Sequence, residues 1–143
     1  MVIHSLLVNH DHIKRTVTNL PNGIRTVTES DDPALAAQIK NHVAEMGQRV
    51  AAGDDPGLPI ETDSLHAIFR YKDNIRTSYE QTSNGIAVVQ TSDDPKAVLA
   101  LQAHAAEVSE LVRGGMAVAH EVMMRNMGRM GGPMMMRMHR DRI

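Results

Sequence analysis

The chain has 143 residues, of which 42% are hydrophobic and 22% are charged, a balance typical of one folded, soluble domain. No apolar run approaches the roughly 20 residues of a membrane-spanning helix, and the N-terminus lacks the basic and then apolar layout of a secretory signal, so we expect no membrane insertion. The chain has no cysteine, which excludes disulfides, thiolate metal sites and thiol nucleophiles.

The N-terminal half begins with a short predicted helix followed by a β-hairpin. Residues 6–8 form a short apolar stretch, and β-forming residues follow at 13–20 and 24–29, on either side of Asn22-Gly23. Asn-Gly between β-formers is a strong hairpin signal, because both central residues of a type I′ turn need positive φ. We therefore expect the two strands to form a hairpin, and Pro21 just before Asn22-Gly23 suggests a slightly longer loop there.

A long helix is predicted after the hairpin. The carboxylate of Asp32 can accept a bond from a free backbone amide at the N-cap, and Pro33 suits the first helical position because it has no amide hydrogen to leave unpaired. Gly53 is placed to end the helix. Apolar residues recur between these limits at helical spacing: Leu35, Ile39, Val43, Met46 and Val50.

The second half of the chain repeats the first. A shift of 62 positions aligns residues 4–53 with residues 66–115 without a gap, and 16 of the 50 pairs are identical, where about three would be expected by chance. Residues 51–62, rich in Gly, Asp and Pro, form the linker between the repeats. The repeat predicts the same elements again: a short helix at 65–71, strands at 75–80 and 86–89, and a helix that begins at Pro95 and stops near Gly114-Gly115.

These elements predict an α+β fold made of two α-β-β-α units. Neither unit alone would bury much apolar area, so we expect both hairpins to join in one four-stranded antiparallel sheet with the helices packed on one face. The single duplicated domain would span residues 1–127, with a C-terminal helix from about Met116. Residues 128–143 would form a flexible tail rich in Met and Arg, in which Gly131, Gly132 and Pro133 break the helix.

The order Asn-Gly, Ser-Asp-Asp-Pro and then a helix with a histidine ten residues after the aspartate resembles small bacterial proteins of tandem-repeat type. The resemblance covers residues 4 to about 120. It implies a bacterial origin and a metal or redox setting, and it assigns no functional residue.

Two histidines occupy equivalent places in the repeats. His42 and His104 lie on the apolar stripes of the long helices, and each has a glutamate three residues later, Glu45 and Glu107. Such a pair could offer imidazole and carboxylate to one metal ion, or the carboxylate could orient the ring. The alternative is a partly buried histidine that is hydrogen-bonded within the fold and needs no ligand.

Other histidines give weaker signals. His10 and His12 would lie on one face of a strand and could chelate a metal there, whereas on a helix end or turn they would diverge. His4 and His66 are equivalent residues at predicted helix starts, where a neutral imidazole is favoured over a charged one.

Methionine is concentrated at the C-terminal end, where nine of the eleven lie between Met116 and Met138. A thioether binds hard ions poorly and Cu(I) well, so dense methionine with occasional histidine and no thiolate is the ligand set expected for copper. The leading hypothesis is therefore a non-catalytic protein that buffers or delivers copper. Its candidate ligands are Met116, His120, Met123, Met124, Met127, Met130, Met134, Met135, Met136, Met138 and His139, with His42 and His104 as a second site.

Two other functions stay open. The methionine stripe could instead be a hydrophobic surface through which the protein oligomerises or docks a partner, and His42, His104 or Met116 could ligate a metal or haem redox centre. Five arginines and one aspartate give residues 125–143 a charge of +4, which leaves −6 on residues 1–124. We expect no nucleic-acid binding, because the body is acidic and no aromatic residues interleave the tail arginines. As written, the chain would be cytoplasmic, or periplasmic if a signal peptide had been removed.

Overall fold

A computed structural model describes the backbone of residues 2–55, 57 and 61–141 and the side chains of residues 5–55, 57 and 61–127. Both halves contain the same elements in the same order. The first half comprises α1 (Val2–Val8), η1 (His10–His12), β1 (Lys14–Leu20), β2 (Gly23–Glu29) and α2 (Pro33–Ala52). The second half comprises α3 (Asp63–Arg70), η2 (Lys72–Asn74), β3 (Ile75–Gln81), β4 (Gly85–Ser92) and α4 (Pro95–Asp141).

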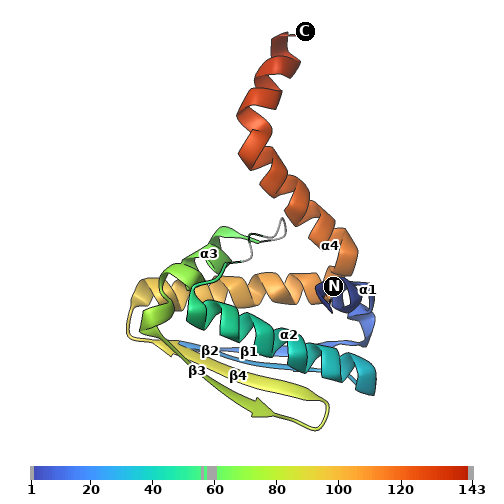
Figure 1. Ribbon diagram of the computed structural model, residues 1–143, viewed down its shortest axis with the longest axis vertical. Helices are drawn as coiled ribbons and strands as arrows, with labels where there is room; N and C mark the ends of the chain where they lie inside the picture. Colours follow the sequence, from blue (N-terminus) through green and yellow to red (C-terminus); the bar gives the residue numbers. More distant parts are fainter. Residues whose placement is uncertain (1, 56, 58–60, 142–143) are drawn as a thin grey trace.

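The four strands form one antiparallel sheet in the order β1-β2-β4-β3, so the two hairpins meet along β2 and β4. The helices lie on one side of this sheet (Figure 1). Thr26 pairs with Val88, its equivalent in the other half, so a local twofold axis passes through this pair. The predicted α+β fold with a four-stranded antiparallel sheet is confirmed.

The hairpins are where the sequence places them, but the first has neither the type I′ turn typical of Asn-Gly nor the longer loop suggested by Pro21. Neither Asn22 nor Gly23 has positive φ, and Leu20 pairs with Gly23, which leaves Pro21 and Asn22 as the turn. The glycine is required by the neighbouring strand instead. A Cβ on Gly23 would collide with the backbone of Gln90 in β4.

The second hairpin repeats this arrangement. A Cβ on Gly85 would collide with the backbone of Thr28 in β2. The amide of Ser92 donates to the carbonyl of Asn22, and that of Ser30 donates to the carbonyl of Asn84, both at 2.9 Å. Glycine therefore serves the close approach of β2 and β4, where the two halves join.

Both long helices begin as predicted. The Asp32 carboxylate accepts from the amides of Ala34 at 2.9 Å and Leu35 at 3.4 Å, and Pro33 occupies the first turn. In the second half, Asp94 accepts from the amide of Lys96 at 2.9 Å. Gly53 ends α2 in the left-handed conformation, with φ of 69°.

Helix α4 differs from the predicted stop at Gly114-Gly115. Gly115 has a φ of 58° and a ψ of −135°, so the helix kinks there and then continues. The kink frees the carbonyl of Val112, which accepts a 2.7 Å bond from Nδ1 of His10. Beyond the kink the helix projects away from the body of the molecule (Figure 1).

The predicted helix break at Gly131, Gly132 and Pro133 is also absent, and the backbone is helical to Asp141. Glycine tolerates helical φ and ψ at a modest cost, and a proline removes one helical hydrogen bond without preventing the helix from continuing. The flexibility of residues 128–143 stays a prediction.

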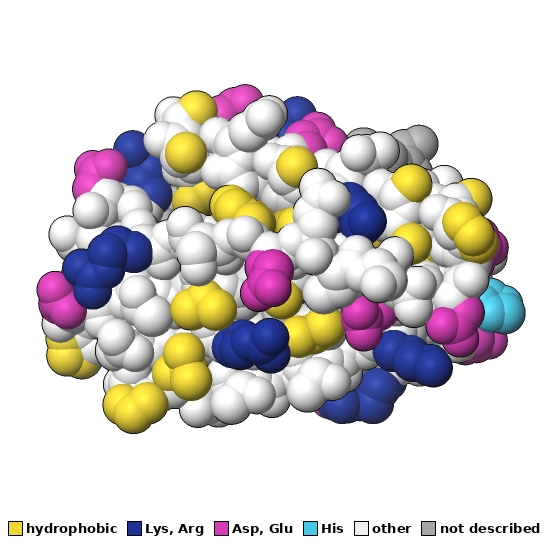
Figure 2. Space-filling view, turned by 90° about the horizontal axis from the view of Figure 1, so that it is seen from below, with side chains coloured by type: hydrophobic (Ala, Val, Ile, Leu, Met, Phe, Trp, Pro, Cys, Tyr) yellow, Lys and Arg dark blue, Asp and Glu magenta, His cyan; other side chains and the backbone are white. Residues whose placement is uncertain are grey.

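The core lies between the helices and the sheet in two clusters. Ile24, Ile68 and Leu101 belong to one, and Ile39 and Ile86 belong to the other. On the side of the strands, hydrophobic side chains are interspersed with Lys, Arg, Asp and Glu side chains (Figure 2). None of the described helices is long and apolar enough to cross a membrane.

Candidate functional site

A cavity of about 980 Å³, partly open to solvent, lies between the sheet and the long helices α2 and α4. All four strands, both long helices and the N-terminal elements contribute to its wall. Most of the lining surface is apolar, and half of the lining residues are aliphatic, among them Leu6, Ile13, Ile24, Ile39, Val43, Ile68, Ile75, Ile86, Val88 and Val108. The space therefore has the predominantly hydrophobic lining of a small-molecule binding pocket.

The cavity lies across the local twofold axis. Thr26 and Val88, which pair at the centre of the sheet, both line it. His42 and His104 line it from equivalent positions on α2 and α4. The structure thus brings the two histidines that the sequence singled out to one cavity, from opposite halves.

His104 is the more enclosed of the two histidines. The residue is half-buried, and burial of its ring, together with the charge of Arg15, lowers its pKa to about 4. The ring is therefore neutral at physiological pH. Its Nδ1 atom is buried and has no hydrogen-bond partner among the described residues.

His42 differs in its electrostatic surroundings. Burial lowers the pKa of this imidazole, and Glu45 opposes the shift. Glu45 itself bonds to Arg49 at 3.4 Å, while Glu107 accepts from the hydroxyls of Thr62 and Ser64. The two glutamates thus have other hydrogen-bond partners, and metal binding by His42 and His104 stays a prediction.

Arg15 is the cavity residue that the sequence reasoning missed. It lies on β1 and turns toward the helices, where it donates to Thr28 Oγ1 at 3.0 Å, Ser109 Oγ at 3.2 Å and the carbonyl of Ala105 at 3.5 Å. Burial lowers the pKa of the guanidinium to about 10. The signal was present in the alternation of β1, which places Arg15 on the same face as Ile13 and Val17.

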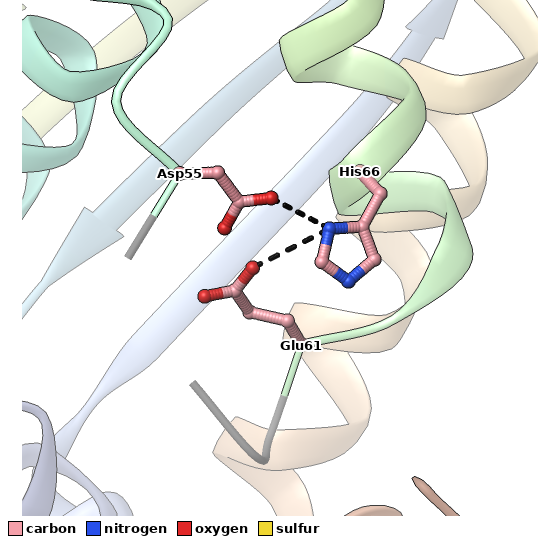
Figure 3. A group of neighbouring side chains, drawn as sticks. All are labelled: Asp55, Glu61 and His66. Atoms are coloured by element: carbon pink, nitrogen blue, oxygen red, sulfur yellow. Dashed lines mark hydrogen bonds and ion pairs between the residues drawn. The ribbon is translucent and has the colours of Figure 1, made fainter. Parts of the chain in front are cut away.

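A separate group of polar side chains joins the linker to α3 (Figure 3). Nδ1 of His66 lies 2.6 Å from Asp55 Oδ2 and 3.6 Å from Glu61 Oε1. Candidate ligand atoms of all three residues lie within 4.8 Å of one another, so the group could hold a divalent cation with one nitrogen and two oxygens. A hydrogen bond with Glu61, the amide of Gly57 and His66 all lower the pKa of Asp55.

Such an oxygen-rich set does not suit Cu(I). The contacts of His66 with Asp55 and Glu61 connect the linker to the first turn of α3. No spacing in the sequence signals this group, because Asp55 and His66 are brought together by the path of the linker.

The His10-Asp11-His12 segment forms the turn η1 and not a strand. His10 is half-buried and bonded to the kink of α4, whereas His12 is exposed. The two rings therefore have different surroundings and do not form the chelating pair considered for a strand. The side chain of His4 lies outside the described residues.

The methionine stripe follows the projecting part of α4. Met116, Met124 and Met127 are 37%, 54% and 61% exposed, His120 is exposed, and Met123 is half-buried. These thioethers are therefore not buried in the core. The side chains of the other candidate ligands, Met130, Met134, Met135, Met136, Met138 and His139, lie outside the described residues.

No protein-family model matches the chain, and the chain matches no curated protein and no solved structure. The function is therefore argued from the cavity and from the exposed face of α4.

Proposed function

We propose that this protein is a non-catalytic carrier that binds a hydrophobic small molecule in the cavity between the sheet and helices α2 and α4. The cavity itself carries this proposal, because its volume of about 980 Å³ is at the upper end of the usual range for ligand sites, about 300 to 1,000 Å³. Most of the lining surface is apolar although polar side chains are interspersed in it, and a mainly apolar surface suits the binding of an apolar body.

The space is partly open to solvent, so water or a ligand fills it. An apolar ligand would remove the aliphatic side chains of the wall from water, which favours its binding.

A neutral fluorescent probe tests the proposal. N-phenyl-1-naphthylamine, titrated into the full chain after lipid has been stripped from it, is expected to bind with a blue-shifted and stronger emission. The protein has no tryptophan to interfere with the signal. Absence of saturable binding to the folded chain would refute the carrier proposal.

Two α2 variants show whether the probe occupies the cavity. Val43 lines it, so Val43→Phe is expected to reduce the affinity by filling part of the space. Ala37 lies on the exposed side of the same helix, so Ala37→Phe is the matched control and is expected to bind as the wild type does. Circular dichroism verifies that both variants are folded. Equal affinities in the two variants would place the probe elsewhere.

A second candidate function, Cu(I) binding, is favoured by the exposure of the α4 stripe. Met116, His120 and Met124 follow one another at intervals of four residues, so neighbouring side chains lie on the same face of the helix. Thioethers and an imidazole in this arrangement suit Cu(I). Competition with a bicinchoninate complex of Cu(I) measures such binding.

Replacement of methionine by leucine separates copper binding from docking. A variant in which leucine replaces Met116, Met123, Met124 and Met127 keeps the volume and apolarity of the stripe. It removes the sulfur atoms. Loss of copper binding supports the metal site, and unchanged copper binding excludes these sulfurs as ligands. Retained self-association in the same variant would support the alternative of a hydrophobic contact surface.

A further inference from the structure

The strongest clue to the cavity ligand is the charge of Arg15. A guanidinium has five N–H donors, and three of them are used for Ser109, Thr28 and Ala105. One N–H remains on each terminal nitrogen. Two such donors match the two oxygens of a carboxylate.

The partners of Arg15 leave its charge uncompensated. All three acceptors are neutral oxygens, and no carboxylate among the described side chains forms an ion pair with the guanidinium. A buried charge without a partner is unfavourable, and a ligand of opposite charge relieves this cost. The cavity wall at Arg15 therefore favours an anionic group.

Three other charged side chains on the cavity wall already have polar partners. Glu107 accepts hydrogen bonds from Thr62 and Ser64, and Glu61 lies against His66. Lys72 pairs with Asp73 at 3.0 Å, and Lys40 is a half-buried residue of α2. Lys40 is thus the one further cation of the described lining to be tested beside Arg15.

His104 provides a second polar group in the same part of the cavity. It directly precedes Ala105, whose carbonyl accepts from Arg15, and the charge of Arg15 acts on the His104 ring. The unpartnered Nδ1 atom of a neutral imidazole can carry a hydrogen and donate it to an oxygen. Arg15 and His104 together can thus recognise an anionic oxygen group.

The two halves of the cavity differ in charge. The residue equivalent to Arg15 in the second half is Thr77, which also lines the cavity. The guanidinium is therefore present on one side only, and most of the remaining lining surface is apolar. A ligand that fits this distribution has one anionic end and a long apolar body.

We propose that the cavity binds a long-chain aliphatic carboxylate, with its headgroup on Arg15 and His104 and its chain along the aliphatic wall. This inference rests on the proposed carrier function and defines the chemical class of its ligand. Displacement of the neutral probe by dodecanoate and by 1-dodecanol, at concentrations below micelle formation, tests it in the full chain. The wild type is expected to prefer the acid over the alcohol by about tenfold or more, since hydrogen bonds to a charged group are the stronger ones.

Substitutions based on the repeat locate the headgroup. Arg15→Thr introduces the residue of the equivalent position and is expected to abolish the preference while the probe still binds. Lys40→Gln introduces the residue found at Gln102, and Arg76→Thr removes an arginine that does not line the cavity, so both are expected to keep the preference. Loss of the preference in Lys40→Gln instead of Arg15→Thr would overturn the assignment to Arg15.

The outcomes separate this inference from the carrier function. A wild type that binds the probe but shows equal affinity for acid and alcohol overturns the carboxylate proposal and leaves the carrier intact. A wild type that binds no probe overturns the carrier itself. If Arg15→Thr does not fold, dodecanoate labelled with ¹³C at its carboxyl gives an independent answer by NMR. The bound carboxyl of the wild type is expected to stay ionised to a lower pH than the free acid, and an unchanged titration would contradict the proposal.

Discussion

The buried imidazole of His104 predicts a loss of stability on mild acidification. Its pKa is about 4 in the folded protein, against 6.5 as the ordinary value expected in the unfolded chain. Between these values the unfolded chain binds a proton that the folded protein does not bind, so the free energy of unfolding falls as pH falls. The contribution is complete above pH 6.5, decreases toward pH 4 and changes no further below that.

The magnitude follows from the difference between the two values. At about 1.36 kcal/mol for each pH unit, the whole loss is about 3 kcal/mol, of which about 2 kcal/mol is expected between pH 7.5 and pH 5. Two kcal/mol is a substantial part of the stability of a domain of this size.

Guanidinium chloride unfolding, followed by circular dichroism at several pH values, measures this loss. His104→Phe replaces the imidazole by a ring that does not titrate, so the fall in stability of the wild type should exceed that of the variant by about 2 kcal/mol between pH 7.5 and pH 5. His42→Phe keeps His104 and is expected to keep most of the fall. If the free energy of unfolding fell equally with pH in the wild type and in His104→Phe, the reasoning would be refuted. The pKa of His104 would then be the same in the folded and unfolded states.

Three further predictions concern particular contacts. Gly115→Ala is expected to destabilise the fold by about 1 to 3 kcal/mol, measured by chemical denaturation, because its positive φ is strained for alanine and the new Cβ meets the ring of His10; an unchanged midpoint would argue against strain at the kink. Gly85→Ala is expected to cost about 1 to 3 kcal/mol in the same assay because the Cβ collides with the backbone of Thr28, and an unchanged midpoint would contradict the close approach of β2 and β4. His66→Asn is expected to raise the pKa of the Asp55 carboxyl, followed by ¹³C NMR, because one of the contacts that lower that pKa is weakened; a titration identical to that of the wild type would exclude His66 as a cause.

Local chemistry explains why much of the fold follows from the sequence. Asp32 and Pro33 define the start of α2 through capping and a fixed φ, and both act within a few residues of chain. The turn at Pro21-Asn22 was harder to predict, because Gly23 serves contact with β4, more than 60 residues away in the chain. A pattern that signals a local turn can thus have a long-range cause.

The candidate site was predicted only in part for a related reason. Helical spacing was enough to put His42 and His104 on equivalent inner faces, and the repeat implied that they would lie in related places. The size of the space between the helices depends on how the halves pack, which no local pattern reveals. Arg15 was identifiable as an inward residue of β1, but its lack of a carboxylate partner depends on contacts with α4.

The seam between β2 and β4 is isologous, since Gly23 opposes Thr91 in the same way that Gly85 opposes Glu29. Each half therefore presents a strand edge that is complementary to itself, and two copies of one half could build the same sheet as a homodimer. Such a dimer would carry identical residues on both walls, with either two arginines or none at the position of Arg15. Because the two halves are joined in one polypeptide, their residues can differ. Only one wall of the cavity therefore carries an arginine at this position.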